Sequence, residues 1–268
     1  MTLTMRTTNV ARPGELLEVI PSPAIGRVLV VVPTYCEAEN IVTVVTRIRH
    51  TCPAAEVLVV DDNSPDGTGR IAAGLARQYT WTHVLSRPAK SGLGAAYRDG
   101  FTWGLERGYD VLVEMDADLS HDPAALPKLL TAIERGADLA IGSHYVPGAS
   151  IPQWTPGRRA LSRYGNRYAA FMLRLDAADL TSGYRAFTAS ALRAADYATT
   201  AADGYAFQIE LARRVAGARR LIREVPITFG DRAHGESKMS MRISGEALLL
   251  VTWWGIQDRL RPFTFRRR

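Results

Sequence analysis

Two aspartates, Asp116 and Asp118, end an apolar segment that begins at Val111. On an extended backbone, side chains two residues apart leave the same face, so the two carboxylates point the same way. Carboxylate oxygens suit Mg²⁺ or Mn²⁺, which proteins usually hold with one or two carboxylates and with substrate phosphates. An acidic pair of this kind also fits a solvated turn. Because ligands lie beyond the carboxyl ends of buried strands in open α/β sheets, the apolar run before the pair favours a metal site.

A second polar loop, residues 61–68, follows the apolar run 56–60. It resembles the start of a calcium loop, but Ala73 stands where such a loop needs a glutamate, which excludes that interpretation. The loop could accept hydrogen bonds from a base and a ribose, or it could form an Asx-turn shaped by Pro65 and Gly67. The two roles can coexist.

A glycine pair, Gly92 and Gly94, precedes a predicted helix and invites comparison with dinucleotide-binding loops. Tyr97 occupies the position of the third glycine, and the pair does not follow the first strand, which disfavours a Rossmann dehydrogenase. The helix N-terminus beside Lys90 still suits a phosphate or sugar hydroxyls.

The elements that position these loops alternate along the chain. Expected strands are residues 28–32, where Pro33 is expected to end the strand, 56–60, 83–86, 111–115 and 138–141. Expected helices are residues 39–50, one ending near Tyr79, one opened by residues 90–94 and ending at Arg107, and 123–135. This alternation predicts an α/β fold with a mainly parallel sheet and helices on both faces.

Composition sets the outer limits. The 268 residues fit one large α/β domain, and two cysteines, Cys36 and Cys52, cannot form a disulfide framework, which favours a reducing cytosol. The net charge is +6, and five arginines with no acid stand in the last ten residues. Such a tail fits anionic lipid or nucleic acid, or a solvated chain end.

Neither end of the chain predicts a membrane span. Residues 1–26 lack the apolar core of a signal peptide and suggest a flexible arm. The longest uncharged apolar stretch near the C-terminus, residues 247–257, has eleven residues, whereas a spanning helix needs about twenty. We therefore expect a soluble or peripheral protein.

Five motifs recur in order with compatible spacing: residues 32–40 (VPTYCEAEN), 60–68 (VDDNSPDGT), 115–123 (MDADLSHDP), 142–146 (GSHYV) and 179–185 (DLTSGYR). Together they resemble the polyprenol (dolichol) monophosphate mannose synthases, inverting family 2 glycosyltransferases with a GT-A fold. The resemblance covers roughly residues 27–241. It implies a flexible arm (1–26), a GT-A catalytic domain (27–239) and an amphipathic, basic C-terminal segment facing a membrane or partner (240–268).

The resemblance also implies roles for individual residues. The residues that match the binding site for GDP-mannose are Pro33, Tyr35, Glu37, Asp62, Asp66, Lys90, Gly92, Asp116, Arg232 and Lys238. Asp116, Asp118 and Ser120 match the ligands of Mg²⁺ or Mn²⁺, Ser120 standing where some relatives have Gln. Asp118, Arg232 and Lys238 match the residues that act on the reacting groups.

The acceptor phosphate has its own predicted ligands. Arg158 and Ser162 lie four residues apart on one face of a helix that begins with several cations, and a guanidinium with a hydroxyl suits a lipid phosphate. A solvated basic helix is the alternative. The chain departs from the family at Cys36, where Asn is common, and at His144, where relatives often carry Arg for this phosphate.

The implied reaction is attack of the acceptor phosphate on the anomeric carbon of mannose, with loss of GDP and a β-linked product. A phosphate is already anionic near neutral pH, so no general base is required, and the sequence shows no obvious His–Asp pair. The metal, Arg232 and Lys238 are expected to stabilise the departing diphosphate, while Asp118 is expected to help position the acceptor.

The C-terminal segment carries apolar residues between 248 and 256, including two tryptophans, before Arg259. Tryptophan and arginine favour the membrane interface, although a helix packed on the domain also fits. We expect a peripheral protein at the cytoplasmic face of the membrane, with a separate anchoring protein and no nucleic acid. A synthase using UDP-glucose is the nearer alternative, and a non-enzymatic basic module binding membrane or RNA is the remote one.

Overall fold

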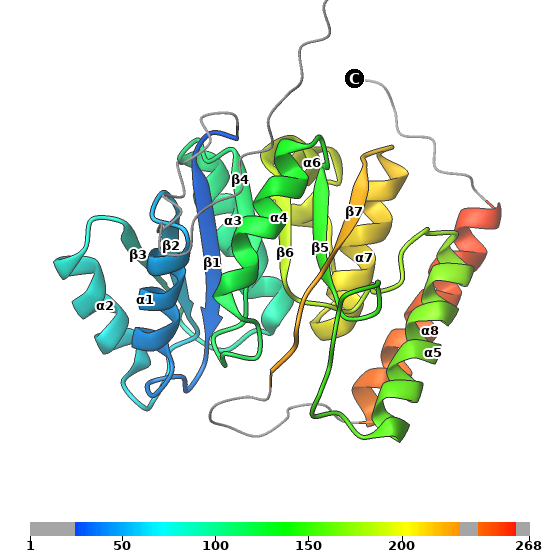
Figure 1. The fold of residues 1–268 in the computed structure, drawn as a ribbon, viewed down its shortest axis with the longest axis horizontal. Coiled ribbons are helices and arrows are strands. Elements are labelled where there is room, and N and C mark those ends of the chain that lie inside the picture. The colour runs from blue at the N-terminus through cyan, green and yellow to red at the C-terminus, as the bar shows by residue number, and fades with distance from the viewer. Residues whose placement is uncertain (1–24, 231–240, 261–268) are drawn as a thin grey trace, which may run out of the picture.

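The computed structural model describes residues 25–230 and 241–260, and for the last helix the side chains from residue 245 onward (Figure 1). Within these residues, one seven-stranded sheet has the order β3-β2-β1-β4-β6-β5-β7. The strands are β1 (Val28–Thr34), β2 (Glu56–Asp61), β3 (Thr82–Ser86), β4 (Val111–Glu114), β5 (Leu139–Ser143), β6 (Arg185–Thr188) and β7 (Ile222–Pro226). All run parallel except β6, which pairs antiparallel with β4 and β5.

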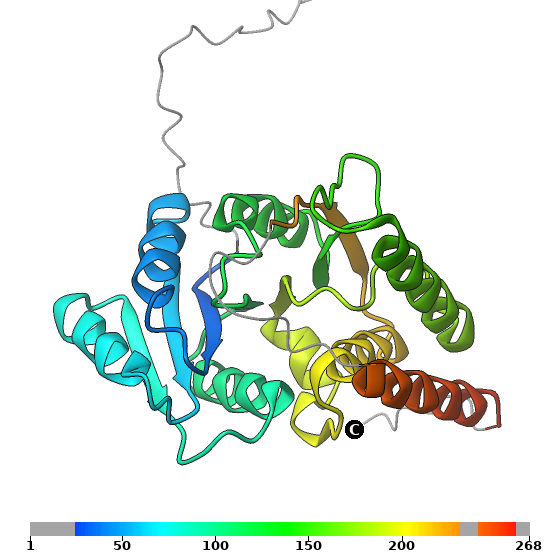
Figure 2. The same cartoon turned by 90° about the horizontal axis from the view of Figure 1, so that it is seen from below.

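Helices cover both faces of the sheet (Figures 1 and 2). They are α1 (Ile41–Thr51), α2 (Thr68–Gln78), α3 (Leu93–Glu106), α4 (Leu126–Glu134), α5 (Pro156–Leu173), α6 (Ala189–Ala194), α7 (Gly204–Gly217) and α8 (Met241–Leu260), with 3₁₀ turns at Pro123–Ala125 and Tyr197–Thr199. The predicted α/β fold with a mainly parallel sheet is confirmed.

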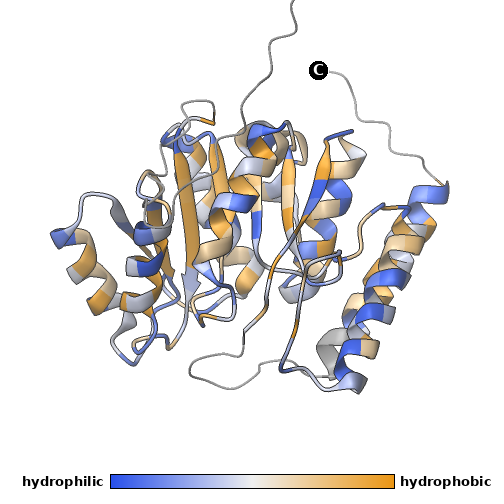
Figure 3. Cartoon of the chain, viewed as in Figure 1, coloured by the Kyte–Doolittle hydropathy of each residue, from blue (hydrophilic) through white to orange (hydrophobic). Residues whose placement is uncertain are grey.

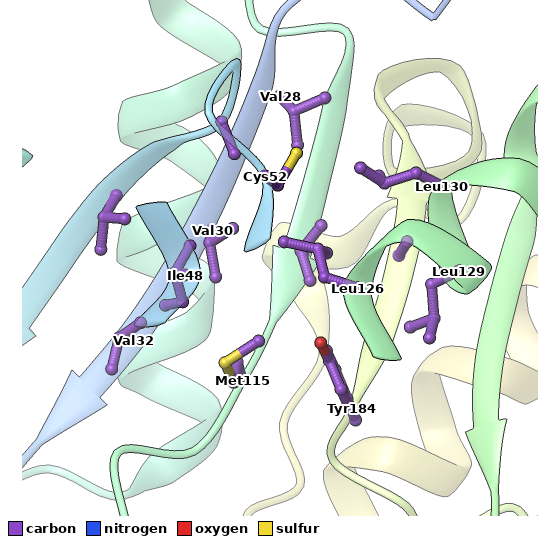
Figure 4. Close-up of a cluster of buried hydrophobic side chains, with 14 of the residues drawn as sticks. Val28, Val30, Val32, Ile48, Cys52, Met115, Leu126, Leu129, Leu130 and Tyr184 are labelled. Carbon is purple, nitrogen blue, oxygen red and sulfur yellow. The ribbon is translucent and has the colours of Figure 1, made fainter. Parts of the chain in front are cut away.

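The central strand explains why the sheet is buried on both sides. Val28, Val30 and Val32 join a cluster packed under α1, α2 and α4, of which Figure 4 shows a part. Leu29 and Val31 join the opposite cluster under α3, α6 and α7. A continuous β-branched run suits such a strand, since successive side chains enter opposite cores. The apolar strands stand out against the polar outer faces of the helices in Figure 3.

The end of the first strand differs from the prediction. Pro33 does not stop β1, which continues through Thr34 with Pro33 beside Val60 of β2. In a strand, successive backbone groups point to opposite neighbours, and the Thr34 carbonyl accepts a hydrogen bond from Asp62 on the β2 side. The Pro33 nitrogen therefore faces the β4 side, where the ladder has already ended at Val31. Its missing N–H costs the sheet no hydrogen bond.

One edge of the sheet collects the loops that carry the sequence motifs. The carboxyl ends of β1, β2, β4, β5 and β7 lie at this edge, and antiparallel β6 adds its amino end. In Figure 1 it is the lower edge. Residues 35–40, 62–67, 115–121, 144–155 and 179–184 consequently meet there, although they are far apart in the sequence.

Helices α5 and α8 lie side by side at one flank of the domain (Figures 1 and 2). The Tyr168 and Thr252 hydroxyls are 2.6 Å apart, and Arg259 donates to the Met172 carbonyl at 3.0 Å. No helix within residues 25–230 or 241–260 combines the length and apolar character that crossing a bilayer requires. The predicted C-terminal helix is present as α8, which buries Ala247 and Val251 and exposes apolar side chains on its outer face.

Candidate active site

A cleft of about 310 Å³ opens at the loop-bearing edge of the sheet. Its walls come from the β4 loop, the segment after β5, the start of α5, the loop before β6 and the segment after β7. The lining residues are Asp116, Ser120, His121, His144, Trp154, Arg158, Ser162, Thr181, Ser182, Gly183, Tyr205, Phe229 and Gly230. Two predicted metal ligands and all three predicted acceptor ligands thus line the same cleft.

The two aspartates have different surroundings. The Asp116 side chain is 31% exposed and faces the cleft, and the Tyr97 hydroxyl donates to it at 3.4 Å. His121 Nδ1 lies 3.7 Å from an Asp116 oxygen, too far for a hydrogen bond. Asp118 is buried, and one of its oxygens accepts hydrogen bonds from the Ser120 backbone N–H at 3.0 Å and from the Ser120 hydroxyl at 2.6 Å. Ser120 therefore supports Asp118 directly.

These oxygens fit a divalent cation that substrate completes. Within residues 25–230 and 241–260, no group of three or more His, Cys, Asp or Glu residues could hold a metal alone. One carboxylate at the cleft, Asp116, with a second, buried one two residues on, Asp118, suits a metal that takes its other ligands from phosphate and water. Gly183 leaves room beside this pair: a methyl group there would sit 3.5 Å from an Asp116 oxygen.

Tyr97 could not be identified as a site residue from the sequence, because it lies on α3 among core residues. It is fully buried against Phe101 and Phe207. Burial, followed by the charge of Asp116, raises the pKa of Tyr97 well above its ordinary value. The phenol consequently stays protonated and donates to Asp116.

The residues predicted to hold the nucleoside form a separate group of loops at the ends of β1 and β2. Pro33, Tyr35 and Glu37 are half-buried, and Lys90 Nζ lies 4.1 Å above the Tyr35 ring. Asp62 is buried and paired with Arg87 at 2.5 Å. The 310 Å³ cleft is lined by none of the five predicted nucleoside residues, Pro33, Tyr35, Glu37, Asp62 and Asp66, nor by Lys90.

Asp66 has a structural role that the Asx-turn interpretation anticipated. One of its oxygens accepts from the backbone N–H and the hydroxyl of Thr68, and the other accepts from the Ala38 N–H at 3.0 Å. Partial burial raises its pKa, but these hydrogen bonds outweigh that effect and lower the pKa overall. The anionic carboxylate therefore joins the β1 and β2 loops.

The glycine loop before α3 is held from across the sheet edge. Gly92 has φ of 93°, and a side chain there would collide with the Asp203 carboxylate. The same carboxylate accepts a hydrogen bond from the Gly94 N–H at 3.0 Å. Gly92 is therefore required for backbone conformation and for close approach.

The predicted acceptor residues come together as expected. Arg158 lies in the first turn of α5, where Thr155 caps the helix, and its guanidinium sits 4.2 Å above the Trp154 ring. Ser162 follows one turn later on the cleft side. Asn166 is buried and binds the Leu180 N–H at 2.7 Å, which fixes α5 against the loop before β6.

His144 belongs to a His–Asp pair that the sequence did not reveal. Its Nδ1 lies 2.5 Å from an Asp179 oxygen, and its backbone N–H donates to the same oxygen at 3.0 Å. The expectation that the chain has no such pair is wrong. The two residues are 35 positions apart, and only the antiparallel return of the chain into β6 brings them together.

Two ionisable side chains lie buried beneath the cleft. Glu114 and Arg185 are neighbours across β4 and β6, and both are fully buried. Burial raises the pKa of Glu114 to about 8, although the charge of Arg185 opposes the shift. Arg185 donates to the carbonyls of Ser182, Gln208 and Leu180. This arginine therefore fixes the backbone of the loop before β6.

Further lining residues carry no signal in the sequence. Phe229 packs edge-on against His121, His144 and Trp154. An isolated bridge joins Phe229 to His121, and no local pattern predicts such a long-range contact. Arg232 and Lys238, predicted to act on the donor diphosphate, lie outside the described residues.

Comparisons with known proteins agree with this architecture. Residues 29–195 match the family Glycosyl transferase family 2. An undecaprenyl-phosphate mannosyltransferase of Micrococcus luteus is 51% identical over 87% of this chain and 96% of its own. A polyprenol monophosphomannose synthase of Mycolicibacterium smegmatis is 49% identical over 87% of this chain and 89% of its own. A dolichol-phosphate mannosyltransferase of Pyrococcus furiosus is 36% identical over 89% of this chain and 67% of its own.

Solved structures support the fold at lower identity. Glucosyl-3-phosphoglycerate synthase from Mycobacterium tuberculosis, in complex with Mn²⁺, UDP and glucosyl-3-phosphoglycerate, aligns with a TM-score of 0.62 and 21% identity. The alignment covers 94% of this chain and 86% of that one. The same enzyme with Mn²⁺ and UDP-glucose gives a TM-score of 0.60 at 20% identity, over 87% and 79%.

Proposed function

The chain belongs to glycosyl transferase family 2, and from this we propose that it transfers mannose from GDP-mannose to the phosphate of a polyprenyl monophosphate. Three relatives whose names give a mannosyltransferase or mannose synthase of a lipid phosphate support the sugar and the class of acceptor. The products are GDP and a polyprenyl-phosphate β-mannose.

One observation carries the proposal: Asp116 of the acidic pair and the cationic start of α5 face one cleft. Asp116 lines it from the β4 loop, and Arg158 and Ser162 line it from α5. A donor diphosphate beside the aspartates would therefore present its sugar toward a phosphate bound at α5. Holding both reactants in line lowers the barrier by removing the entropy cost of their encounter.

The reaction needs one bond to form as another breaks. An acceptor phosphate oxygen attacks the anomeric carbon of mannose, and the bond from that carbon to the GDP oxygen breaks, with inversion. Arg158 and the Ser162 hydroxyl orient the attacking phosphate. We assign Arg232 and Lys238 to the departing diphosphate, whose growing negative charge they stabilise.

We assign Asp116 and Asp118 to a divalent cation, Mg²⁺ or Mn²⁺, with Ser120 as a further oxygen ligand. The bound cation would neutralise charge on the diphosphate leaving group. Tyr97 keeps Asp116 oriented, and Ser120 keeps Asp118 oriented through the hydrogen bonds described above. Asp118 also helps to position the acceptor.

The loops after β1 and β2 are assigned to the guanosine and to the flank of the donor. Pro33, Tyr35 and Glu37 supply a rigid turn, an aromatic ring and a carboxylate. Asp62 is buried with Arg87, so its carboxylate is held in one orientation for a ribose or base donor. Lys90 and Gly92 border the same space from the loop before α3.

The α5–α8 flank is assigned to the membrane, consistent with a catalytic unit over residues 27–239 and a lipid-facing segment over 240–268. Most of the exposed large apolar side chains of the described residues lie on these two helices: Leu161, Tyr164, Tyr168, Phe171, Leu248, Leu249, Leu250, Trp253, Ile256 and Leu260. Exposed arginines of α5, Arg158, Arg159, Arg163 and Arg167, lie among them. Apolar groups beside cations suit the interface of an anionic bilayer.

This flank leads to the cleft, because the first turns of α5 belong to both. A lipid phosphate at the membrane surface can therefore reach Arg158 while its chain stays in the bilayer. Cys36 and Cys52 are both free thiols, which suits the cytoplasmic face. A separate anchoring protein would bind the same apolar flank.

The test is sugar transfer from radiolabelled GDP-mannose to a short-chain polyprenyl phosphate, with and without divalent metal. Asp118→Ala and a parallel assay with UDP-glucose complete the design. Metal-dependent mannolipid from the wild type, lost in Asp118→Ala, is the expected result. Transfer from UDP-glucose alone would replace the substrate, and absence of any donor binding would refute the proposed function.

A further inference from the structure

The Asp179 carboxylate lies beside the cleft and accepts hydrogen bonds on both of its oxygens. It is fully buried, and one oxygen accepts from the Thr181 N–H and hydroxyl and from the Ser182 N–H, at 3.1–3.2 Å. The other oxygen accepts from the His144 N–H and from Nδ1. Burial raises the pKa of Asp179, but the hydrogen bonds from His144 and the backbone outweigh it and lower the pKa overall.

This geometry fixes the imidazole of His144. An ionised carboxylate only accepts hydrogen bonds, so Nδ1 must carry a proton. The other ring nitrogen, Nε2, is buried and has no hydrogen-bond partner among the described residues. A buried polar atom without a partner is costly, and such atoms are often satisfied by a ligand.

The surroundings of Nε2 belong to the acceptor side of the cleft. His144 lines the cleft together with Arg158 and Ser162. The Phe229 ring packs edge-on against the imidazole, with centroids 5.0 Å apart. An acceptor phosphate beside Arg158 would therefore meet His144 by replacing part of this aromatic contact.

Other charged or titratable groups face this region from each neighbouring element. They are Arg158 and Arg163 of α5, Tyr145 after β5, Glu224 of β7, Arg185 of β6, and Asp116 and His121 of the β4 loop. Within the described residues none of these groups is hydrogen-bonded to the imidazole, whereas Asp179 is.

We propose that Asp179 is a positioning residue that holds His144 so that Nε2 binds the acceptor phosphate, with a single proton shared between imidazole and phosphate. This inference rests on the proposed function. A phosphate monoanion gives its proton to Nε2 and leaves a dianion beside an imidazolium, or a dianion binds an imidazolium already formed. The two routes reach the same complex, in which Asp179 balances the imidazolium charge.

The shared proton predicts a pH dependence that arginine at this position would not give. The proposed complex holds one proton more than a dianionic phosphate beside a neutral imidazole, so binding must take up one proton wherever both free partners have lost theirs. The acceptor KM then rises about tenfold per pH unit by linkage. An arginine keeps its charge, so no proton is taken up.

The experiment measures the acceptor KM of the full chain with a short-chain polyprenyl phosphate from pH 6 to 9, at saturating GDP-mannose and metal. The wild type, His144→Arg, His144→Gln and Asp179→Asn are compared. His83→Gln is the matched control, because His83 pairs with Glu56 at 2.8 Å at the opposite edge of the sheet. Thermal melting identifies any variant that does not fold.

We expect the wild-type and His83→Gln acceptor KM to rise with pH, whereas in His144→Arg it stays flat above pH 7. Asp179→Asn should begin its rise at lower pH, because the imidazolium loses its countercharge, with the KM for GDP-mannose unchanged. A flat wild-type profile, or a His144→Arg profile that rises like the wild type, would overturn the inference even if Asp179→Asn does not fold. Absence of transfer by the wild type at pH 6.5 would instead refute the proposed function.

Discussion

Replacing Arg87 by Met tests whether one buried ion pair supports the donor loops. Arg87 and Asp62 are 9% and 8% exposed, so the variant leaves a carboxylate in a desolvated position without its partner. Removing one member of a buried pair costs about 3–5 kcal/mol, because the remaining charge is uncompensated. We therefore expect Arg87→Met to lower the free energy of unfolding by about this amount.

Urea unfolding followed by circular dichroism gives this free energy, and titration with GDP gives the effect on the nucleotide. GDP affinity should fall as well, because Asp62 loses its fixed orientation. Asp99→Asn is the control. Asp99 is the second partner of Arg87, and its side chain is 53% exposed. Because exposed ion pairs contribute only about 0–1 kcal/mol, Asp99→Asn should change the free energy of unfolding little.

The double variant Arg87→Met with Asp62→Asn separates lost attraction from stranded charge. Asparagine is neutral, so the double variant should be more stable than Arg87→Met alone. A loss below about 1 kcal/mol in Arg87→Met, or a double variant no more stable than the single one, would refute the reasoning.

Three further predictions follow from features away from the reacting groups. Burial raises the pKa of Glu56, but hydrogen bonds from His83, Tyr109 and Arg27 outweigh this effect and lower the pKa overall. The stability that Glu56 contributes is therefore present above its pKa in the unfolded chain, and it disappears as the pH falls through its pKa in the folded protein. Glu56→Gln should flatten the fall in melting temperature below about pH 4.5. Gly94→Ala should cost about 1–3 kcal/mol in urea unfolding, since its methyl would meet a backbone oxygen at 2.7 Å; an unchanged midpoint would contradict this overpacking. Phe171→Asp with Leu249→Asp should abolish sedimentation with anionic vesicles at unchanged melting temperature, whereas Val42→Asp, also exposed but on α1, should bind like the wild type.

The parallel half of the sheet could be predicted from the sequence because its strands are continuous apolar runs. Residues 28–32 and 56–60 lie in β1 and β2, and 111–114 form β4. Continuous apolar runs are typical of buried parallel strands, and parallel strands place all their carboxyl ends at the same edge of the sheet. The acidic pair and the two loops beside it were therefore predicted at the correct edge.

The other half of the sheet could not be predicted in the same way. Strand β6 has four residues and begins with a buried arginine, which no propensity scale favours. Arg185 is stable there because three backbone carbonyls, of Leu180 and Ser182 in the loop before β6 and of Gln208 in α7, accept its hydrogen bonds. The pairing of His144 with Asp179 depends on this strand and was missed for the same reason.

The direction of β6 has a consequence for how the chain could be re-engineered. Because β5 and β6 are antiparallel neighbours, the segment between them leaves the sheet and returns to it at the same edge. Its two ends are about one strand spacing apart, roughly 5 Å. Residues 144–184, with α5 and the acceptor side of the cleft, thus form a cassette attached at two adjacent points. A cassette of another length can be grafted there while the donor loops of β1 and β2 keep their framework.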